Sequence, residues 1–136
     1  MTRTDYERMI CSRRAAGHAS TVPFETVAFD GGSPAIADCH RNVDRWVAAH
    51  PGSIAVRGWI ENGNQSLAAH SIVRLPGGRL IDITPADAWR GCFVEHEGDE
   101  ALFWRMEAGN IQITCISLDG LEAHAAAAAH DSGEML

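Results

Sequence analysis

A cysteine, a histidine and an aspartate can together carry out nucleophilic chemistry, and the sequence offers Cys39, His70 and Asp82. A thiol attacks at neutral pH when a base lies close to its sulfur, and that base needs a third group to fix its tautomer. A cysteine, a histidine and an aspartate in this chain order are one solution. The sequence therefore predicts Cys39 as a nucleophile, His70 as its base and Asp82 as the orienting carboxylate.

The turn between the segments that carry His70 and Asp82 decides whether they can meet. Leu75-Pro76-Gly77-Gly78-Arg79 fits a three-residue hairpin loop, with Pro76 at the second turn position and Gly78 at the left-handed position. Leu75 then faces Arg79, which makes His70 and Asp82 diagonal neighbours on one face. A two-residue loop would place them on opposite faces. Pro76 and Gly78 favour the longer loop.

The elements around this hairpin indicate an α+β domain, in which a nucleophile helix packs on an antiparallel β-meander. The predicted meander has strands over 53–61, 66–75 and 79–84. The Asn62-Gly63-Asn64 turn joins the first two strands. Further predicted elements are a helix over 2–16, a strand over 20–30, a helix from Ser33 to His50, a strand over 91–96, a helix over 99–108, a strand over 111–118 and a helix over 121–130. The whole chain, 1–136, is predicted to be one domain, made of an N-terminal helix (1–19), a core (20–118) and a C-terminal helix with a frayed tail (119–136).

Four short stretches together resemble a recurring bacterial pattern. They are Cys39-His40-Arg41-Asn42-Val43, Gly58-Trp59, His70-Ser71-Ile72-Val73, and Gly78-Arg79-Leu80-Ile81-Asp82-Ile83-Thr84-Pro85. The pattern is similar to small transglutaminase-like and papain-like cysteine hydrolases, and it spans residues 37–85. The resemblance implies the same roles for Cys39, His70 and Asp82, and a peptide or an amide-bearing small molecule as substrate. The stretch before Cys39 lacks the Gly and Trp that flank the nucleophile in those families.

Two local features predict a less reactive sulfur at Cys39. Asp38 is adjacent, and a like charge raises the pKa of a thiol. If Ser33 caps the helix, Cys39 lies beyond its first turn, where the helix dipole helps less. For the oxyanion that an acyl transfer creates, the predicted donors are the backbone amide of Cys39 and a side chain from Asn42, Trp59 or Gln65.

Composition narrows the choice of partner and compartment. Eleven arginines and no lysines stand against eighteen acidic residues, for a net charge of −7, which argues against binding the phosphate backbone of a nucleic acid. No apolar run is long enough to span a membrane, and no signal peptide is apparent. The sequence therefore predicts a cytoplasmic protein whose four widely spaced cysteines are reduced, without a disulfide framework.

Three hypotheses follow. The favoured one is a cysteine enzyme acting on an amide as peptidase, deamidase or acyl transferase, with no cofactor and no metal. A metal-binding protein using Cys39, His40 and His70 is weaker, because the spacing matches no zinc pattern. The third is an interaction or regulatory module that keeps the fold without activity.

Overall fold

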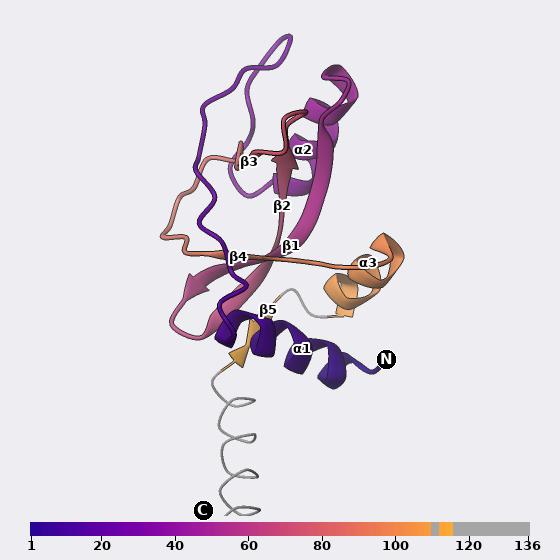
Figure 1. Cartoon of the computed structure of the whole chain (residues 1–136). Coiled ribbons are helices and arrows are strands. Elements are labelled where there is room, and N and C mark those ends of the chain that lie inside the picture. Colours follow the sequence, from indigo (N-terminus) through magenta and orange to yellow (C-terminus); the bar gives the residue numbers. More distant parts are fainter. Residues whose placement is uncertain (110–111, 116–136) are drawn as a thin grey trace, which may run out of the picture.

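Within the part of the chain that the structure describes, an antiparallel sheet of five strands forms the centre, and three helices pack around it (Figure 1). The computed structural model describes residues 1–109 and 112–115. The helices are α1 (Arg3–Ala15), α2 (Cys39–Ala49) and α3 (Glu100–Gly109), and the strands are β1 (Ile54–Gly63), β2 (Ser66–Arg74), β3 (Leu80–Ile81), β4 (Phe93–Glu95) and β5 (Gln112–Thr114). The strand order is β3-β2-β1-β4, and β5 also pairs with β2. The predicted α+β class is confirmed.

The long β1–β2 hairpin organises the sheet. The two strands pair from Ile54 opposite Arg74 to Gly63 opposite Ser66, with a bulge near Asn62. The turn lies at Asn64-Gln65, later than the predicted Asn62-Gly63-Asn64 turn, and Gln65 takes the positive φ of 61°. The bulge allows this shift because it extends β1 beyond the predicted end of the strand.

The β2–β3 hairpin has the predicted register. Val73 pairs with Ile81 and Arg74 with Leu80, so the loop has three residues. Gly78 adopts a φ of +97°, as the left-handed position of this loop requires. β3 is shorter than predicted, because the chain beyond Ile81 leaves β2 and bridges to Phe24 instead.

Two clusters of buried side chains join the helices to the sheet. In one cluster, Tyr6 and Ile10 of α1 and Phe103 of α3 pack against Trp59 of β1. The other places Val43 of α2 against β2 and β3. Figure 1 shows the result, with α2 beside one end of the β1–β2 hairpin and α1 and α3 beside the other.

The prediction of a strand over 20–30 is wrong. The segment is extended but makes only single bridges, from Ser20 to Phe93, from Phe24 to Asp82 and from Phe29 to Gly32. Pro23 lacks the N–H that a continuous ladder needs. The segment nevertheless supports Asp82, whose backbone donates to the Pro23 carbonyl and accepts from the Glu25 amide at 2.9 and 3.0 Å.

The helix predicted from Ser33 begins instead at Cys39, with Asp38 as its N-cap. The Asn42 side chain explains the late start, because it binds both the amide and the carbonyl of Ala35, at 3.1 and 2.8 Å. Those bonds hold Ala35 outside the helix. Ala37 then adopts a positive φ of 62°. Side-chain bonds to nearby backbone commonly compete with helix formation in this way.

Cys11 and Cys115 form a disulfide, with Cα atoms 5.5 Å apart. The prediction of four reduced cysteines is therefore wrong for this pair. The two residues are 104 apart in the chain, and the packing of α1 beside β5 brings them together. Cys39 and Cys92 are free thiols.

The structure has no helix within the described ranges that is long and apolar enough to cross a membrane. Within the strand predicted over 111–118, Gln112–Thr114 form β5, and residues 111 and 116–118 lie outside the described residues. The predicted C-terminal helix and frayed tail lie outside the described residues.

Candidate active site

His70 and Asp82 form the buried pair that the hairpin register predicts. Nε2 of His70 donates to Oδ2 of Asp82 at 2.7 Å, and the two residues are 4% and 3% exposed. The bond holds the ring in one orientation. Because Nε2 is engaged by Asp82, Nδ1 is the ring nitrogen left to face a nucleophile.

Asp82 accepts two further hydrogen bonds. Arg90 donates from Nη1 to Oδ2 at 3.0 Å, and the Thr84 amide donates to Oδ1 at 3.1 Å. Arg90 also donates to the carbonyls of Thr84 and Pro85. Sequence reasoning missed Arg90, since a single arginine in an irregular loop has no periodicity or spacing that points to Asp82. The three donors satisfy the oxygens of this buried carboxylate.

Cys39 lies at the first position of α2, beside an unpaired stretch of β2. On the edge of β2 away from β1, β5 pairs with residues 66–68 and β3 with Val73 and Arg74. None of the described strands pairs with residues 69–72 on that edge. The N-terminal end of α2 lies at this gap, where Cys39 interacts with His70. The structure thus brings all three predicted residues together.

Burial raises the pKa of the Cys39 thiol, but hydrogen bonds and charge from His40 and His70 outweigh it and lower the pKa to about 6. For His70, burial lowers the pKa, while the bonds to Asp82 and Cys39 raise it to about 9. Between these values the favoured state is a thiolate beside an imidazolium. The predicted Ser33 cap does not form, because the helix begins at Cys39, and the pKa of the thiol is lowered although Asp38 is adjacent.

His40 is a second histidine at the sulfur that the catalytic assignment from sequence did not include. Its Nδ1 lies 3.8 Å from Cys39 Sγ and 2.5 Å from Ser71 Oγ. Arg57, which is 8% exposed, donates to the same hydroxyl at 2.9 Å and to Asp44 at 2.6 Å. This chain of contacts fixes the His40 ring. The i,i+1 spacing of Cys39 and His40 was the available signal.

The three side chains predicted as oxyanion donors do not lie free at the sulfur. Asn42 is 3% exposed and ties Ala35 to Thr84, donating to the Thr84 hydroxyl at 3.0 Å. Trp59 is fully buried and donates to Tyr6 at 2.8 Å. Gln65 accepts from Arg14. The first-turn amides of α2 are the better donors, because Asp38 makes no side-chain capping bond to them.

A cavity of about 230 Å³ opens at Cys39. Small side chains form much of its wall, which leaves the sulfur reachable. Its lining residues are Ala37, Asp38, Cys39, His40, Ala68, Ala69 and Glu107. Besides Cys39 and His40, the lining contains two ionisable side chains, the carboxylates of Asp38 and Glu107.

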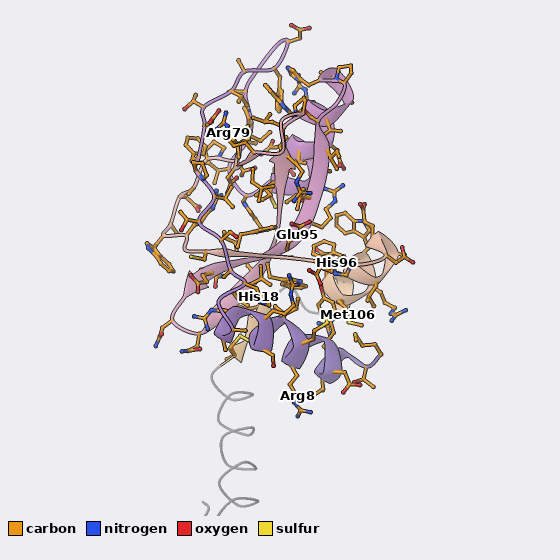
Figure 2. The ribbon with its side chains drawn as sticks, in the orientation of Figure 1. Arg8, His18, Arg79, Glu95, His96 and Met106 are labelled. Carbon is orange, nitrogen blue, oxygen red and sulfur yellow. A yellow bond between two sulfur atoms is a disulfide. The ribbon has the colours of Figure 1, made fainter. Side chains whose placement is uncertain are left out.

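The other histidines and cysteines of the described ranges have different surroundings. His96 lies between β4 and helices α1 and α3 (Figure 2), where Tyr6 donates to its Nδ1 at 2.8 Å. Cys92 contacts the Thr21 hydroxyl at 3.7 Å. Across residues 1–109 and 112–115, no group of three or more His, Cys, Asp or Glu side chains is arranged to hold a metal ion.

Comparison with known proteins found no relative of this chain. No protein-family model, no curated protein and no solved structure matches the chain.

Proposed function

We propose that this protein is a cysteine-dependent amide hydrolase or acyl transferase. Cys39 is the nucleophile, His70 the proton donor and acceptor, and Asp82 the group that orients His70. The observation that carries the proposal is the buried 2.7 Å bond from His70 to Asp82, with Cys39 at the start of α2 and a Cys39 pKa that His70 lowers. The substrate is a peptide or an amide-bearing small molecule.

The first half of the reaction forms a thioester. The Cys39 thiolate attacks the carbonyl carbon, and a sulfur–carbon bond forms while the carbonyl electrons move to oxygen. First-turn amides of α2 stabilise that oxyanion. The carbon–nitrogen bond then breaks, and the proton of the His70 imidazolium passes to the leaving nitrogen. His70 is left neutral.

The second half releases the acyl group. Neutral His70 takes a proton from water or from an acceptor amine, whose oxygen or nitrogen attacks the thioester carbon. The sulfur–carbon bond breaks, and the thiolate and imidazolium are restored. Asp82 keeps the ring orientation through both halves, since its bond to Nε2 does not depend on the proton at Nδ1.

Detection of the thioester tests this proposal without knowledge of the natural substrate. We expect p-nitrophenyl acetate to acetylate Cys39 in a form that hydroxylamine removes, as mass spectrometry of digested protein would show. His70→Ala should slow the acetylation. Cys92, the other free thiol, is the internal control.

Equal and slow acetylation of Cys39 and Cys92, unchanged in His70→Ala, would contradict the proposal. An interaction module that keeps the fold without activity would then be favoured. Added primary amine separates the two activities, because a transferase forms the corresponding amide and a hydrolase releases only acid.

We also propose the cytoplasmic location that the sequence predicts, and the disulfide bears directly on it. Disulfides persist in oxidising compartments and are rare in the cytosol. Cys11 and Cys115 are bonded here. Acid quenching of cells followed by differential alkylation would measure how much of this pair is oxidised in place, and a fully reduced pair would support the cytoplasmic assignment.

A further inference from the structure

A second and larger cavity is lined in part by Asp82 of the His70–Asp82 pair. Its volume is about 690 Å³, and the segments on either side of it are residues 21–24 and 85–92, which run along the same side of the sheet (Figure 1). Its lining residues are Thr21, Val22, Phe24, Ile60, Asp82, Pro85, Ala86, Arg90, Gly91 and Cys92. Cys39 is not among them, so the cavity is separate from the one at the nucleophile.

Most of the cavity wall is apolar, and the cavity opens to solvent. Phe24 is 50% exposed, although its ring forms part of the wall. Val22 packs against the cluster that contains Ile60, which provides a firm floor. The volume falls within the range of about 300–1,000 Å³ that is typical of small-molecule sites. An apolar body of that size would cover the exposed ring.

The charges in the cavity favour an anionic head group. The lining contains two charged side chains, Asp82 and Arg90. Asp82 is 3% exposed and already accepts three hydrogen bonds. Arg90 uses Nη1 for Asp82 and the Thr84 carbonyl, and one N–H of Nη2 for the Pro85 carbonyl.

The guanidinium of Arg90 has five N–H groups. Its Nε and the second N–H of Nη2 have no partner among the described residues, and the side chain is 21% exposed. Two donors on one cation therefore remain for a ligand. Guanidinium groups bind carboxylates well because both are planar and two parallel hydrogen bonds form.

We infer that this cavity binds a small apolar carboxylic acid, with its carboxylate on Arg90 and its apolar body against Val22, Phe24 and Ile60. This cavity contains neither Cys39 nor His70 of the proposed catalytic site, and its binding of a ligand does not depend on that site. It is nevertheless connected to that site, because the Arg90 that holds the ligand also donates to the Asp82 that orients His70.

Titration calorimetry with octanoate, octanol and octylamine, each below its micelle concentration, tests the charge requirement. The three probes share an alkyl chain and differ in the head group. We expect octanoate to bind at least about tenfold more tightly than octanol, the order expected for charge-assisted hydrogen bonds, and octylamine to bind most weakly. Equal binding of the three probes, or preference for octylamine, would overturn the inference.

A filled cavity supplies the matched variant. Ala86 lines the cavity at an exposed position, whereas Ala88 is also exposed but does not line it. Ala86→Trp should abolish octanoate binding, and Ala88→Trp should leave it unchanged. Arg90→Gln should remove the preference for octanoate over octanol. Octanoate binding that survives Ala86→Trp would place the ligand elsewhere and overturn the assignment.

Cys92 reports on the location of the ligand within the same protein. It is a free thiol in the cavity wall. We expect saturating octanoate to slow alkylation of Cys92 by iodoacetamide at least about tenfold, because a bound chain covers the sulfur. Octanol at the same concentration should protect it less. A Cys92 thiol that does not react even without octanoate, or that octanoate leaves unprotected, would contradict an open and occupied cavity.

Discussion

Gly58 of β1 lies directly opposite His70 of β2. A Cβ atom at position 58 would come within 2.3 Å of the Val94 carbonyl oxygen and 2.5 Å of the Phe93 ring. The Phe93 ring occupies this space and packs edge-on against His70, with ring centroids 6.4 Å apart. The absent side chain at Gly58 therefore allows β4 and Phe93 to support the base of the proposed triad.

The first prediction concerns Gly58→Ala. We expect it to lower the free energy of unfolding by about 1–3 kcal/mol, because the backbone of β4 and a buried ring would have to move. It should also change the NMR signals of the His70 ring. Gly77→Ala is the control, because a Cβ there meets nothing within 4 Å. Equal stability of the two variants, measured by urea unfolding, would contradict this account of Gly58.

The pH dependence of Cys39 reactivity provides the second prediction. The folded pKa of the thiol is lowered to about 6, so the alkylation rate should rise as pH increases through about 6 and level off before the ordinary thiol value of 9.0. In His70→Ala the midpoint should move to higher pH, because a hydrogen bond and an opposing charge are lost. Rates of iodoacetamide labelling read by mass spectrometry measure both midpoints, with Cys92 as a reference. A midpoint near 9 in the native protein would show that no thiolate–imidazolium pair forms.

Catalysis should have a second pH limit. His70 donates its proton to the leaving nitrogen, and its pKa is raised to about 9. Acetylation from an amide donor should therefore rise through pH 6 and fall through about pH 9. Simple alkylation needs no proton donor and should not fall above pH 9. A decrease in both reactions would point to unfolding instead.

Asp82→Asn is the third prediction, because it keeps the shape but removes the carboxylate charge. A raised histidine pKa adds stability below the unfolded pKa, near 6.5, and that stability is lost as pH rises through the folded value of about 9. The difference in unfolding free energy between native and Asp82→Asn proteins should therefore shrink from pH 6.5 to 9. Urea titrations at several pH values measure it. A difference that stays constant over this range would mean that Asp82 acts mainly through Arg90 and the Thr84 amide.

The fourth prediction concerns the disulfide. Linking residues 11 and 115 closes a long loop, and in the chain-entropy model such a crosslink contributes about 4–5 kcal/mol. Cys11→Ala with Cys115→Ala should lower the urea midpoint strongly. Cys92→Ala, which removes a free thiol, is the control. A reducing agent should destabilise the native protein and leave the double variant unchanged; the same urea midpoint with and without reductant would contradict a stabilising crosslink.

The carboxylates at the Cys39 cavity lead to the fifth prediction. Asp38 and Glu107 line that cavity, so a cationic methanethiosulfonate reagent should modify Cys39 faster than an anionic one. The ratio of the two rates is independent of how much thiolate is present. Glu107→Gln should reduce the ratio severalfold, whereas the ratio at Cys92 should not change. An unchanged ratio at Cys39 would show that Glu107 does not contribute to the field there.

The pairing of His70 with Asp82 could be predicted from the sequence because a single turn decides it. Pro76 and Gly78 specify a three-residue loop, and the alternation of side chains along the strands then puts both residues on one face. The helices α1 and α3 and the antiparallel order of β1, β2 and β3 were likewise set by local periodicity and turns. All of these features depend on residues close together in the chain.

Tertiary structure alone decided the features that depend on distant residues. The start of α2 at Cys39 comes from Asn42, whose amide bonds to Ala35 and to the distant Thr84 outweigh the helix signal at Ser33 and Pro34. Arg90 reaches Asp82 from an irregular loop, and Cys11 meets Cys115 only because α1 packs beside β5. Side-chain hydrogen bonds and crosslinks between distant segments carry no periodic pattern, so the folded chain is what brings these partners together.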